Sequence, residues 1–372
     1  MGRAVRIGAL ALLAALKCSF TERQARGDVL VVACASAESR QVAEVYARRR
    51  GIPRECLLNL PVPLGEEVDY ETYVSRIERP IRSLVEQRSG IRYVVLCYGV
   101  PYRIKATRRA TAVEDALMRS GRYEDYVKSL DWASVDSELA SLRFRLADRR
   151  GWVRNPLYWG GPDADLVLRV TRLDGPSADA AIALVERAQL AEQRRIPRTA
   201  MVDLNPPLRG SAGYQARNDR MSGTATWLEH MGFTVRRELT PATERRISHW
   251  GRPALYFGWY AEDPVQEAAA GDDFPCGAIA IHLHSYSAST IRSRAANWVG
   301  PLVDHGVTGT VGAVYEPMTD AFPVTDRLAM LLLSGVEFGD AMYRALPYLS
   351  WVMVVVGDPL FRPRYEPRRD PQ

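Results

Sequence analysis

The chain has 372 residues, of which 47% are hydrophobic and 25% are charged, and its formal net charge is +5. These values are ordinary for a globular protein and leave room for one large domain or two modest ones. The basic residues are nearly all arginines and form no long basic stripe of the kind that nucleic-acid binders carry. Composition therefore gives no reason to expect a nucleic-acid partner.

Residues 1–27 have the pattern of an export signal or leader. Arg3 and Arg6 precede the apolar run Ile7–Leu16, which has the length of a signal-peptide core and is too short to stay across a bilayer. No small-residue cleavage site follows, so an unprocessed cytosolic leader is the alternative. We expect a periplasmic or extracellular protein with no permanent membrane span.

The five cysteines give no sign of a metal site or a disulfide framework. No two of them have Cys-x-x-Cys spacing, which is the usual basis of a zinc site built on cysteine pairs. Cys34 and Cys97 lie in apolar runs, where cysteine is usually a small buried hydrophobe. A distant pairing such as Cys34 with Cys97 remains open.

Strand-like and helix-like stretches alternate along the chain. The predicted strands cover residues 28–34, 57–60, 91–98, 166–173, 200–204, 233–238, 254–260, 277–287, 307–315 and 352–356. The predicted helices cover residues 40–50, 70–87 with a kink at Pro80, 178–193, 222–231, 291–305, 324–333 and 338–346. Such alternation predicts an α/β fold, a mainly parallel sheet sandwiched by helices.

The remaining stretches are predicted loops. Residues 103–131 are charged and poor in aliphatic side chains, which indicates a surface excursion or a lid over a substrate. Residues 156–162 and 205–220 are also predicted loops. The turn-rich region near 150–165 divides the chain into an N-terminal subdomain, 28–155, and a second subdomain, 156–372.

Two apolar runs in the C-terminal half define the expected functional edge. Residues 254–260 and 277–287 each resemble a short buried strand that ends in residues able to bond, stack or react. Ligands of open α/β sheets gather beyond the carboxyl ends of neighbouring strands. We therefore expect these two strands to be neighbours, with any site formed by Gly258–Tyr260 and His282–Ser287.

His282 and His284 have the i, i+2 spacing that puts two strand side chains on one face. This spacing suits a pair of metal ligands, but a third is required, and Glu316, Asp203 and Asp358 are only candidates at other predicted strand ends. A packed, hydrogen-bonded histidine is the simpler interpretation. We expect no metal and no cofactor.

Ser285 and His284 could instead form a nucleophile and base, with a carboxylate to orient the imidazole. Glu316 and Asp358 each follow a predicted strand and are the candidate orienting groups. Because adjacent strand residues point to opposite faces, this pairing requires the strand to end at Leu283 or His284. The candidate catalytic residues are thus Ser285, His284 and Glu316.

Aromatic and charged residues complete the candidate binding set. Trp259, Tyr260 and Tyr286 would present ring faces suited to a sugar or peptide, although packing beneath loops is equally consistent with their size.

Two charged residues join this set. Arg172 flanks a strand end and could form an ion pair that supports the sheet or an anion clamp. Asp136 and Glu138 face the same way only if their segment is extended, and Ser134 before them could instead cap a helix.

Several short motifs resemble those of gingipain-type cysteine peptidases, relatives of the caspases and legumains, over roughly residues 28–363. They are Ile91–Ile104, Ser134–Glu138, Val170–Leu173 with the helix that follows it, and Val356–Leu360. The resemblance implies a caspase-like second half and a smaller Rossmann-like first half. The phrases Ser-Val-Asp-Ser-Glu-Leu, Thr-Arg-Leu-Asp-Gly-Pro, Gly-Trp-Tyr-Ala, His-Leu-His-Ser and Gly-Asp-Pro-Leu also identify the chain as a member of a bacterial family of unassigned activity, distantly related to those peptidases.

The departures from the peptidase pattern concern the catalytic pair. In those peptidases the strand that matches residues 254–260 ends in Gly-His-Gly, where the histidine is the base. The strand that matches residues 277–287 ends in the nucleophilic cysteine. Here Gly258 is followed by Trp259, and Ser285 stands at the matching place. The resemblance therefore predicts the fold but argues against cysteine-peptidase chemistry. Two functions stay open: a binding or scaffold protein, or a hydrolase rebuilt around Ser285 and His284, so the sequence leaves enzymatic activity undecided.

Overall fold

A computed structural model describes residues 25–105, 133–144, 152–204, 212–239, 244–259, 263–265 and 273–368. Most of the predicted leader, most of the predicted excursion at 103–131, and Tyr260 lie outside these ranges.

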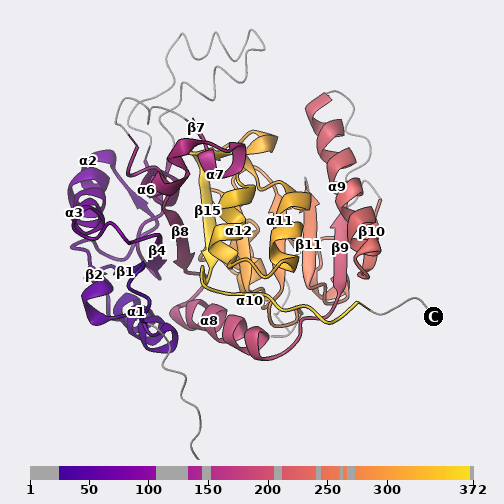
Figure 1. Ribbon diagram of the computed structural model, residues 1–372, viewed down its shortest axis with the longest axis horizontal. Helices are drawn as coiled ribbons and strands as arrows, with labels where there is room; N and C mark the ends of the chain where they lie inside the picture. Colours follow the sequence, from indigo (N-terminus) through magenta and orange to yellow (C-terminus); the bar gives the residue numbers. More distant parts are fainter. Residues whose placement is uncertain are drawn as a thin grey trace, which may run out of the picture.

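A ten-stranded sheet runs through the molecule in the order β10-β9-β11-β12-β13-β15-β8-β4-β1-β2 (Figure 1). Its strands are β1 (Val29–Ala33), β2 (Leu57–Asn59), β4 (Tyr93–Cys97), β8 (Arg169–Leu173), β9 (Thr199–Asp203), β10 (Thr234–Glu238), β11 (Leu255–Trp259), β12 (Ile279–Leu283), β13 (Gly309–Ala313) and β15 (Met353–Gly357). On each side of the β13–β15 pair, every strand is parallel to the next strand in the sheet. Strands β13 and β15 themselves are antiparallel. The predicted α/β fold with a mainly parallel sheet is confirmed.

Two groups of helices flank this sheet. One group contains α1 (Ala37–Arg50), α8 (Ala178–Gln193) and α10 (Val299–Asp304), and the other contains α9 (Ala212–His230), α11 (Thr325–Leu333) and α12 (Phe338–Ala345). Shorter helices are α2 (Tyr70–Thr72), α3 (Arg79–Gln87), α6 (Val135–Ala140) and α7 (Pro156–Trp159). Two small sheets complete the fold: β3 (Glu67–Val68) with β5 (Arg103–Ile104) and β6 (Ala133–Ser134), and β7 (Val153–Arg154) with β14 (Tyr348–Leu349).

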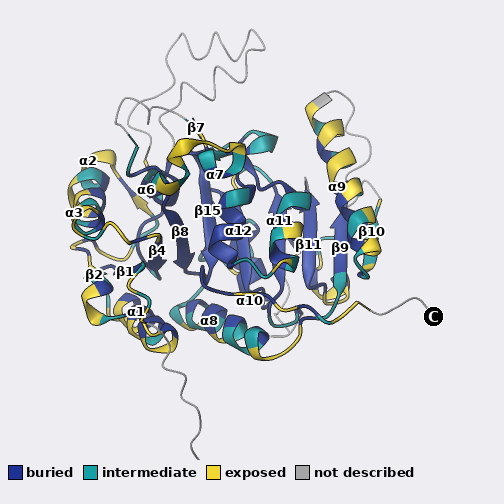
Figure 2. Cartoon of the chain, in the orientation of Figure 1, coloured by how far each residue is buried: buried dark blue, intermediate teal, exposed yellow. Residues whose placement is uncertain are grey.

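Burial on both faces of the sheet explains why the segments that form the central strands are continuously apolar in the sequence. Every residue of β1, β4, β11, β12, β13 and β15 is buried, because helices cover both faces of such a sheet. Figure 2 shows the strands almost entirely in the buried colour, with exposed residues on the outer helix faces. The core is therefore continuous across the sheet.

Local signals fix the helix ends. The Ser36 hydroxyl accepts a hydrogen bond from the Ser39 amide at the start of α1, and Gly51 ends the helix with φ 67°, a conformation that favours glycine. Ser177 caps α8 in the same way as Ser36. Before Pro80, residues Tyr73–Glu78 form a π-helical turn, which is consistent with the predicted kink because proline cannot donate a backbone hydrogen bond.

Three sequence expectations about local structure are wrong. The stretch 291–305 is helical only at Val299–Asp304, because turns before it are held by side chains: Asn297 Oδ1 accepts from the Ser289 hydroxyl and the Thr290 amide. The predicted loop 205–220 already contains the start of α9 at Ala212, and the predicted loop 156–162 contains α7.

The single sheet crosses the predicted subdomain boundary. Strand β8 belongs by sequence to the segment 156–372 but pairs with β4 of the first segment. The boundary near residue 155 stays a prediction. Within the described part of the chain, no helix is both long and apolar enough to span a membrane.

Candidate functional site

The strands predicted at residues 254–260 and 277–287 are neighbours, as the sequence predicts. Strands β11 and β12 pair in parallel, with Gly258 opposite His282 and Trp259 opposite Leu283. Strand β13 lies on the other side of β12, and Glu316 follows its end. The tips of three adjacent parallel strands therefore bring Trp259, Ser285 and Glu316 to one edge of the sheet, which we call the carboxyl edge.

Ser285 is bound to a carboxylate at this edge. Its hydroxyl donates to Oε1 of Glu316 over 2.7 Å, and both residues are half-buried. The Nδ1 atom of His284 lies 2.6 Å from the carbonyl oxygen of Ser285. Because a carbonyl oxygen only accepts, Nδ1 of His284 carries the hydrogen in this contact. The carboxylate of Glu316, rather than this imidazole nitrogen, receives the Ser285 hydroxyl hydrogen.

The residue after Ser285 has a strained backbone. Tyr286 has φ 58°, a region that costs a bulky non-glycine residue roughly 1–3 kcal/mol, and its side chain is 40% exposed. The turn is tied to β13, since the Ser287 hydroxyl accepts from the Ala313 amide and the Tyr286 amide donates to the Tyr315 carbonyl. Strain that the surroundings hold in place is typical of functional sites.

The Trp259 side chain is packed inside the protein and is not exposed at the carboxyl edge. It is 1% exposed, its indole Nε1 donates to Oδ1 of Asn218 over 2.8 Å, and its ring meets Tyr214 edge-on. Gly258 before it is required, because an added Cβ would collide with the Tyr256 hydroxyl. Of the aromatic side chains predicted at this edge, Tyr286 is therefore exposed and Trp259 is buried, while Tyr260 lies outside the described residues.

His282 belongs to a buried stack of rings. Its Nδ1 lies 2.9 Å from the Tyr256 hydroxyl, and its ring stacks on Trp298 with centroids 3.7 Å apart. Burial raises the pKa of Tyr256 well above its usual value, so this hydroxyl stays protonated. The Tyr256 hydroxyl also donates to Asp203 over 3.4 Å, and all these groups lie beneath the edge rather than on it.

The described residues contain no group of three or more histidine, cysteine or acidic side chains that could hold a metal ion. Asp358, one candidate third ligand and orienting group, lies at the opposite edge of the sheet. The reason is that β15 is antiparallel to β13, so that Gly357 pairs with Gly309, the first residue of β13. Asp358 therefore cannot orient His284.

Arg172 and Asp136 form a fully buried ion pair. Nε and Nη2 of the guanidinium lie 2.9 and 2.7 Å from the two Asp136 oxygens. Nη1 also binds Asp174 at 3.3 Å, which is the ion pair predicted to support the sheet edge. Asp136 lies on helix α6, which Ser134 caps, so Asp136 and Glu138 are not paired on one face of a strand.

Sequence reasoning missed Arg292. It follows β12, donates to Asp174 over 3.2 Å, and its guanidinium lies 5.3 Å from the ring centre of Tyr98. The amide of Ile291 next to it donates to the Tyr102 hydroxyl. These contacts join loops that follow β4, β8 and β12. No local signal could have found them, because the partners are more than 100 residues apart in sequence.

Among the described residues, Cys34, Cys97 and Cys276 offer no alternative nucleophile at Ser285. Cys34 and Cys97 are buried, and burial raises the pKa of Cys97 far above its usual range, so that thiol stays protonated. Cys276 precedes β12 and so lies toward the other end of that strand from Ser285.

Comparison with known proteins supports the architecture. No protein-family model matches the chain, and no curated protein matches it. A solved structure of a protease superposes with a TM-score of 0.53 over 91% of this chain and 79% of that protein, at 9% sequence identity. The chain therefore has a caspase-like α/β fold. A structure of the separase–securin complex from Saccharomyces cerevisiae matches 54% of this chain and 14% of that one, with a TM-score of 0.32 and 13% identity. At 9% identity the likeness to the protease concerns the fold alone.

Proposed function

We propose that this chain is an exported protein of caspase-like fold that works without cysteine-peptidase chemistry and binds a peptide or sugar at the carboxyl edge. The observation that carries the proposal is the buried Trp259 at the end of β11, whose indole is committed to Asn218. An indole nitrogen cannot accept a proton, and cysteine catalysis requires a thiolate beside an imidazole. The sequence resemblance to gingipain-type peptidases implies that Ser285, which donates a hydrogen bond to Glu316, takes the place of their nucleophilic cysteine.

The ligand class follows from the groups at the edge. Tyr286 presents an exposed ring, and Ser285, His284 and Glu316 beside it are half-buried polar groups. An aromatic face with nearby hydroxyl and carboxylate groups suits sugars and peptides, which offer both apolar faces and hydrogen-bonding groups. The strained backbone of Tyr286 supports a functional rather than a packing role for this turn.

Binding of purified protein to glycan and peptide arrays tests this proposal. We expect wild-type signals that are lost in Tyr286→Ala and kept in Tyr70→Ala, a matched control because Tyr70 is a 53% exposed tyrosine on α2 rather than in the turn after β12. Absence of any array signal would contradict the proposal, and so would equal binding by both variants.

A second candidate function is a serine hydrolase. It rests on the 2.7 Å hydrogen bond from Ser285 to Glu316. In this chemistry the Ser285 oxygen attacks a substrate carbonyl carbon while its proton passes to Glu316. The proton then moves to the leaving group, and water hydrolyses the acyl-serine. This version uses Glu316 as the base, in place of the role for His284 expected from sequence.

A further inference from the structure

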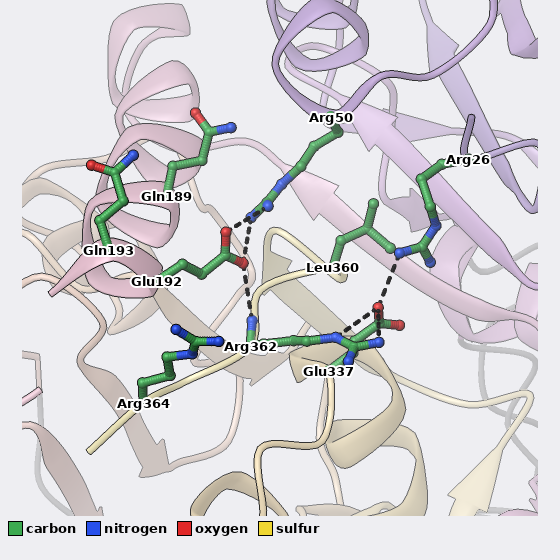
Figure 3. A pocket seen from close by; sticks show the side chains of 9 residues that line it. All are labelled: Arg26, Arg50, Gln189, Glu192, Gln193, Glu337, Leu360, Arg362 and Arg364. Carbon is green, nitrogen blue, oxygen red and sulfur yellow. Dashed lines mark hydrogen bonds and ion pairs between the residues drawn. The ribbon is translucent and has the colours of Figure 1, made fainter. Parts of the chain in front are cut away.

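The charges around a cavity near the start of β1 pair with one another. The volume of this cavity is about 570 Å³, and Figure 3 shows the side chains that line it. The ion pairs join Arg26 to Asp28 and Glu337, and Arg50 to Glu192 and Asp358. Because these charges are matched within the protein, they indicate no charged ligand.

A second cavity, of about 440 Å³, lies beside β3 and has an apolar wall. The apolar residues that line it are Val62, Pro63, Leu64, Val68 and Pro101. Leu64 is 42% exposed, so part of this wall is open to solvent. The wall comes from the loop after β2, from β3 and from the loop after β4. We call this cavity the β3 cavity.

The β3 cavity lies where sheets of this kind bind ligands. Strand β1 lies between β2 and β4, so the chain crosses first to one side of β1 and then to the other. Ligands of open α/β sheets bind beyond the carboxyl ends of the strands at such a reversal. Leu64 lies over this point, because a Cβ added to Gly99 after β4 would be 2.9 Å from Leu64 Cγ and 3.1 Å from Cys34 Sγ after β1. The cavity is therefore next to the carboxyl ends of β1 and β4.

Strand β3 also has a free edge, because it is the end strand of its three-stranded sheet. The Glu66 carbonyl accepts from the Arg103 amide. The Val68 carbonyl accepts from the Lys105 amide. In a parallel pair, the residue between two such carbonyls points its own N–H and C=O to the other side. The N–H and C=O of Glu67 therefore face the free edge, and no backbone group in the described ranges bonds to them.

The charges around the β3 cavity favour a cationic partner. The charged residues that line it or belong to the ion pairs of its lining are Glu66, Glu67, Asp69, Arg103 and Lys105. Three carboxylates thus meet two cations, which gives a formal charge of −1. The Thr72 amide and hydroxyl donate to Asp69, hold its pKa below the usual range and keep it ionised. Within the described ranges, no cation pairs with Asp69.

We propose that the β3 cavity binds an extended peptide, which pairs with the free edge of β3 and has an apolar and a basic side chain. Glu67 presents one backbone donor and one backbone acceptor, which is what strand addition by a peptide requires. The apolar side chain packs on Leu64 and Pro101, and the basic one pairs with Asp69. The cavity volume lies within the range of ligand sites. The inference is independent of the proposed function, which concerns the turn after β12.

Screening of the full chain against a random library of acetylated hexapeptides, followed by fluorescence polarisation with the strongest binders, tests the site. We expect saturable binders that contain arginine or lysine together with an aliphatic residue. N-methylation of one backbone amide of such a peptide should weaken binding about tenfold, because it removes an edge hydrogen bond, and it tests the edge without altering the protein.

Three protein variants test the same contacts. Glu67→Pro should also weaken binding about tenfold, because proline has no N–H to donate. Leu64→Asp should weaken binding at least as much, because it puts a charge in the apolar wall. Asp69→Asn, which can still cap α2, should reduce the preference for basic peptides. Unchanged urea midpoints would show that each variant is folded.

Leu239→Asp is the matched control for Leu64→Asp, because Leu239 is a 57% exposed leucine after β10 that does not line the cavity. It should bind as the wild type does, and so should Tyr286→Ala. The inference is overturned if no library peptide binds saturably, if Glu67→Pro and Asp69→Asn bind every selected peptide as the wild type does, or if Leu239→Asp weakens binding as much as Leu64→Asp. If every binder is lost in Tyr286→Ala and kept in Glu67→Pro, the peptides bind the turn after β12, which supports the proposed function and overturns this inference.

Discussion

Removal of Asp136 should destabilise the protein strongly. Asp136 and Arg172 are both 0% exposed, and the carboxylate accepts hydrogen bonds from Nε and Nη2 of the guanidinium. Breaking a buried pair by deleting one partner typically costs about 3–5 kcal/mol, because the other charge stays buried. Asp174 still contacts Arg172 at 3.3 Å, so we expect the lower end, about 3 kcal/mol.

Urea unfolding followed by tryptophan fluorescence measures this cost. With an m-value of about 3 kcal/mol per molar, the midpoint of Asp136→Ala should fall by about 1 M. Glu86→Ala is the control, since its side chain is 67% exposed, and its midpoint should stay unchanged. The double variant Asp136→Leu/Arg172→Met should recover much of the loss. A fall of less than about 0.3 M for Asp136→Ala would refute the buried-charge reasoning.

Three further changes have defined outcomes. Hydrogen bonds from Arg26 and other donors hold the pKa of Glu337 below its usual value. The stability that the Glu337 carboxylate contributes is therefore present above its unfolded pKa and is lost as the pH falls from about 5. Glu337→Gln should flatten that part of a profile of urea midpoint against pH, and an unchanged profile would contradict this. Gly258→Ala should cost about 1–3 kcal/mol through the clash with the Tyr256 hydroxyl, and Tyr256→Phe in the same chain should relieve part of it; strict additivity in the thermal midpoints would disprove the clash. Ser134→Ala should cost about 1–2 kcal/mol, because the hydroxyl both caps α6 and donates within the core; a calorimetric loss near zero would argue against it.

The central strands could be predicted from sequence because they are fully buried apolar runs, whereas β2 and β10 at the ends of the sheet are partly exposed. Residues 254–260 and 277–287 contain β11 and β12, and their predicted adjacency is confirmed. The direction of β15 could not be predicted, because a buried strand has the same composition whichever way it runs. That one reversal moves Asp358 to the opposite edge, away from His284.

The site residues were found where they follow a strand and were missed where they lie in loops. Ser285 and Glu316 each follow a buried strand, and the structure joins them by a hydrogen bond. Arg292 lies in a stretch whose pattern predicts a helix, yet it pairs with Asp174 from a distant loop. Whether the Trp259 side chain is buried or exposed depends on its hydrogen bond to Asn218, and only folding brings these two residues together.

The central claim of the proposed function is that the carboxyl edge works without cysteine-peptidase chemistry. Labelling of the purified protein with a peptidyl acyloxymethyl ketone and with a fluorophosphonate, followed by mass spectrometry, tests it most directly. Our account predicts that neither probe forms an adduct with any cysteine or with Ser285. A fluorophosphonate adduct on Ser285 that disappears in Glu316→Gln would contradict it and would establish the serine hydrolase instead.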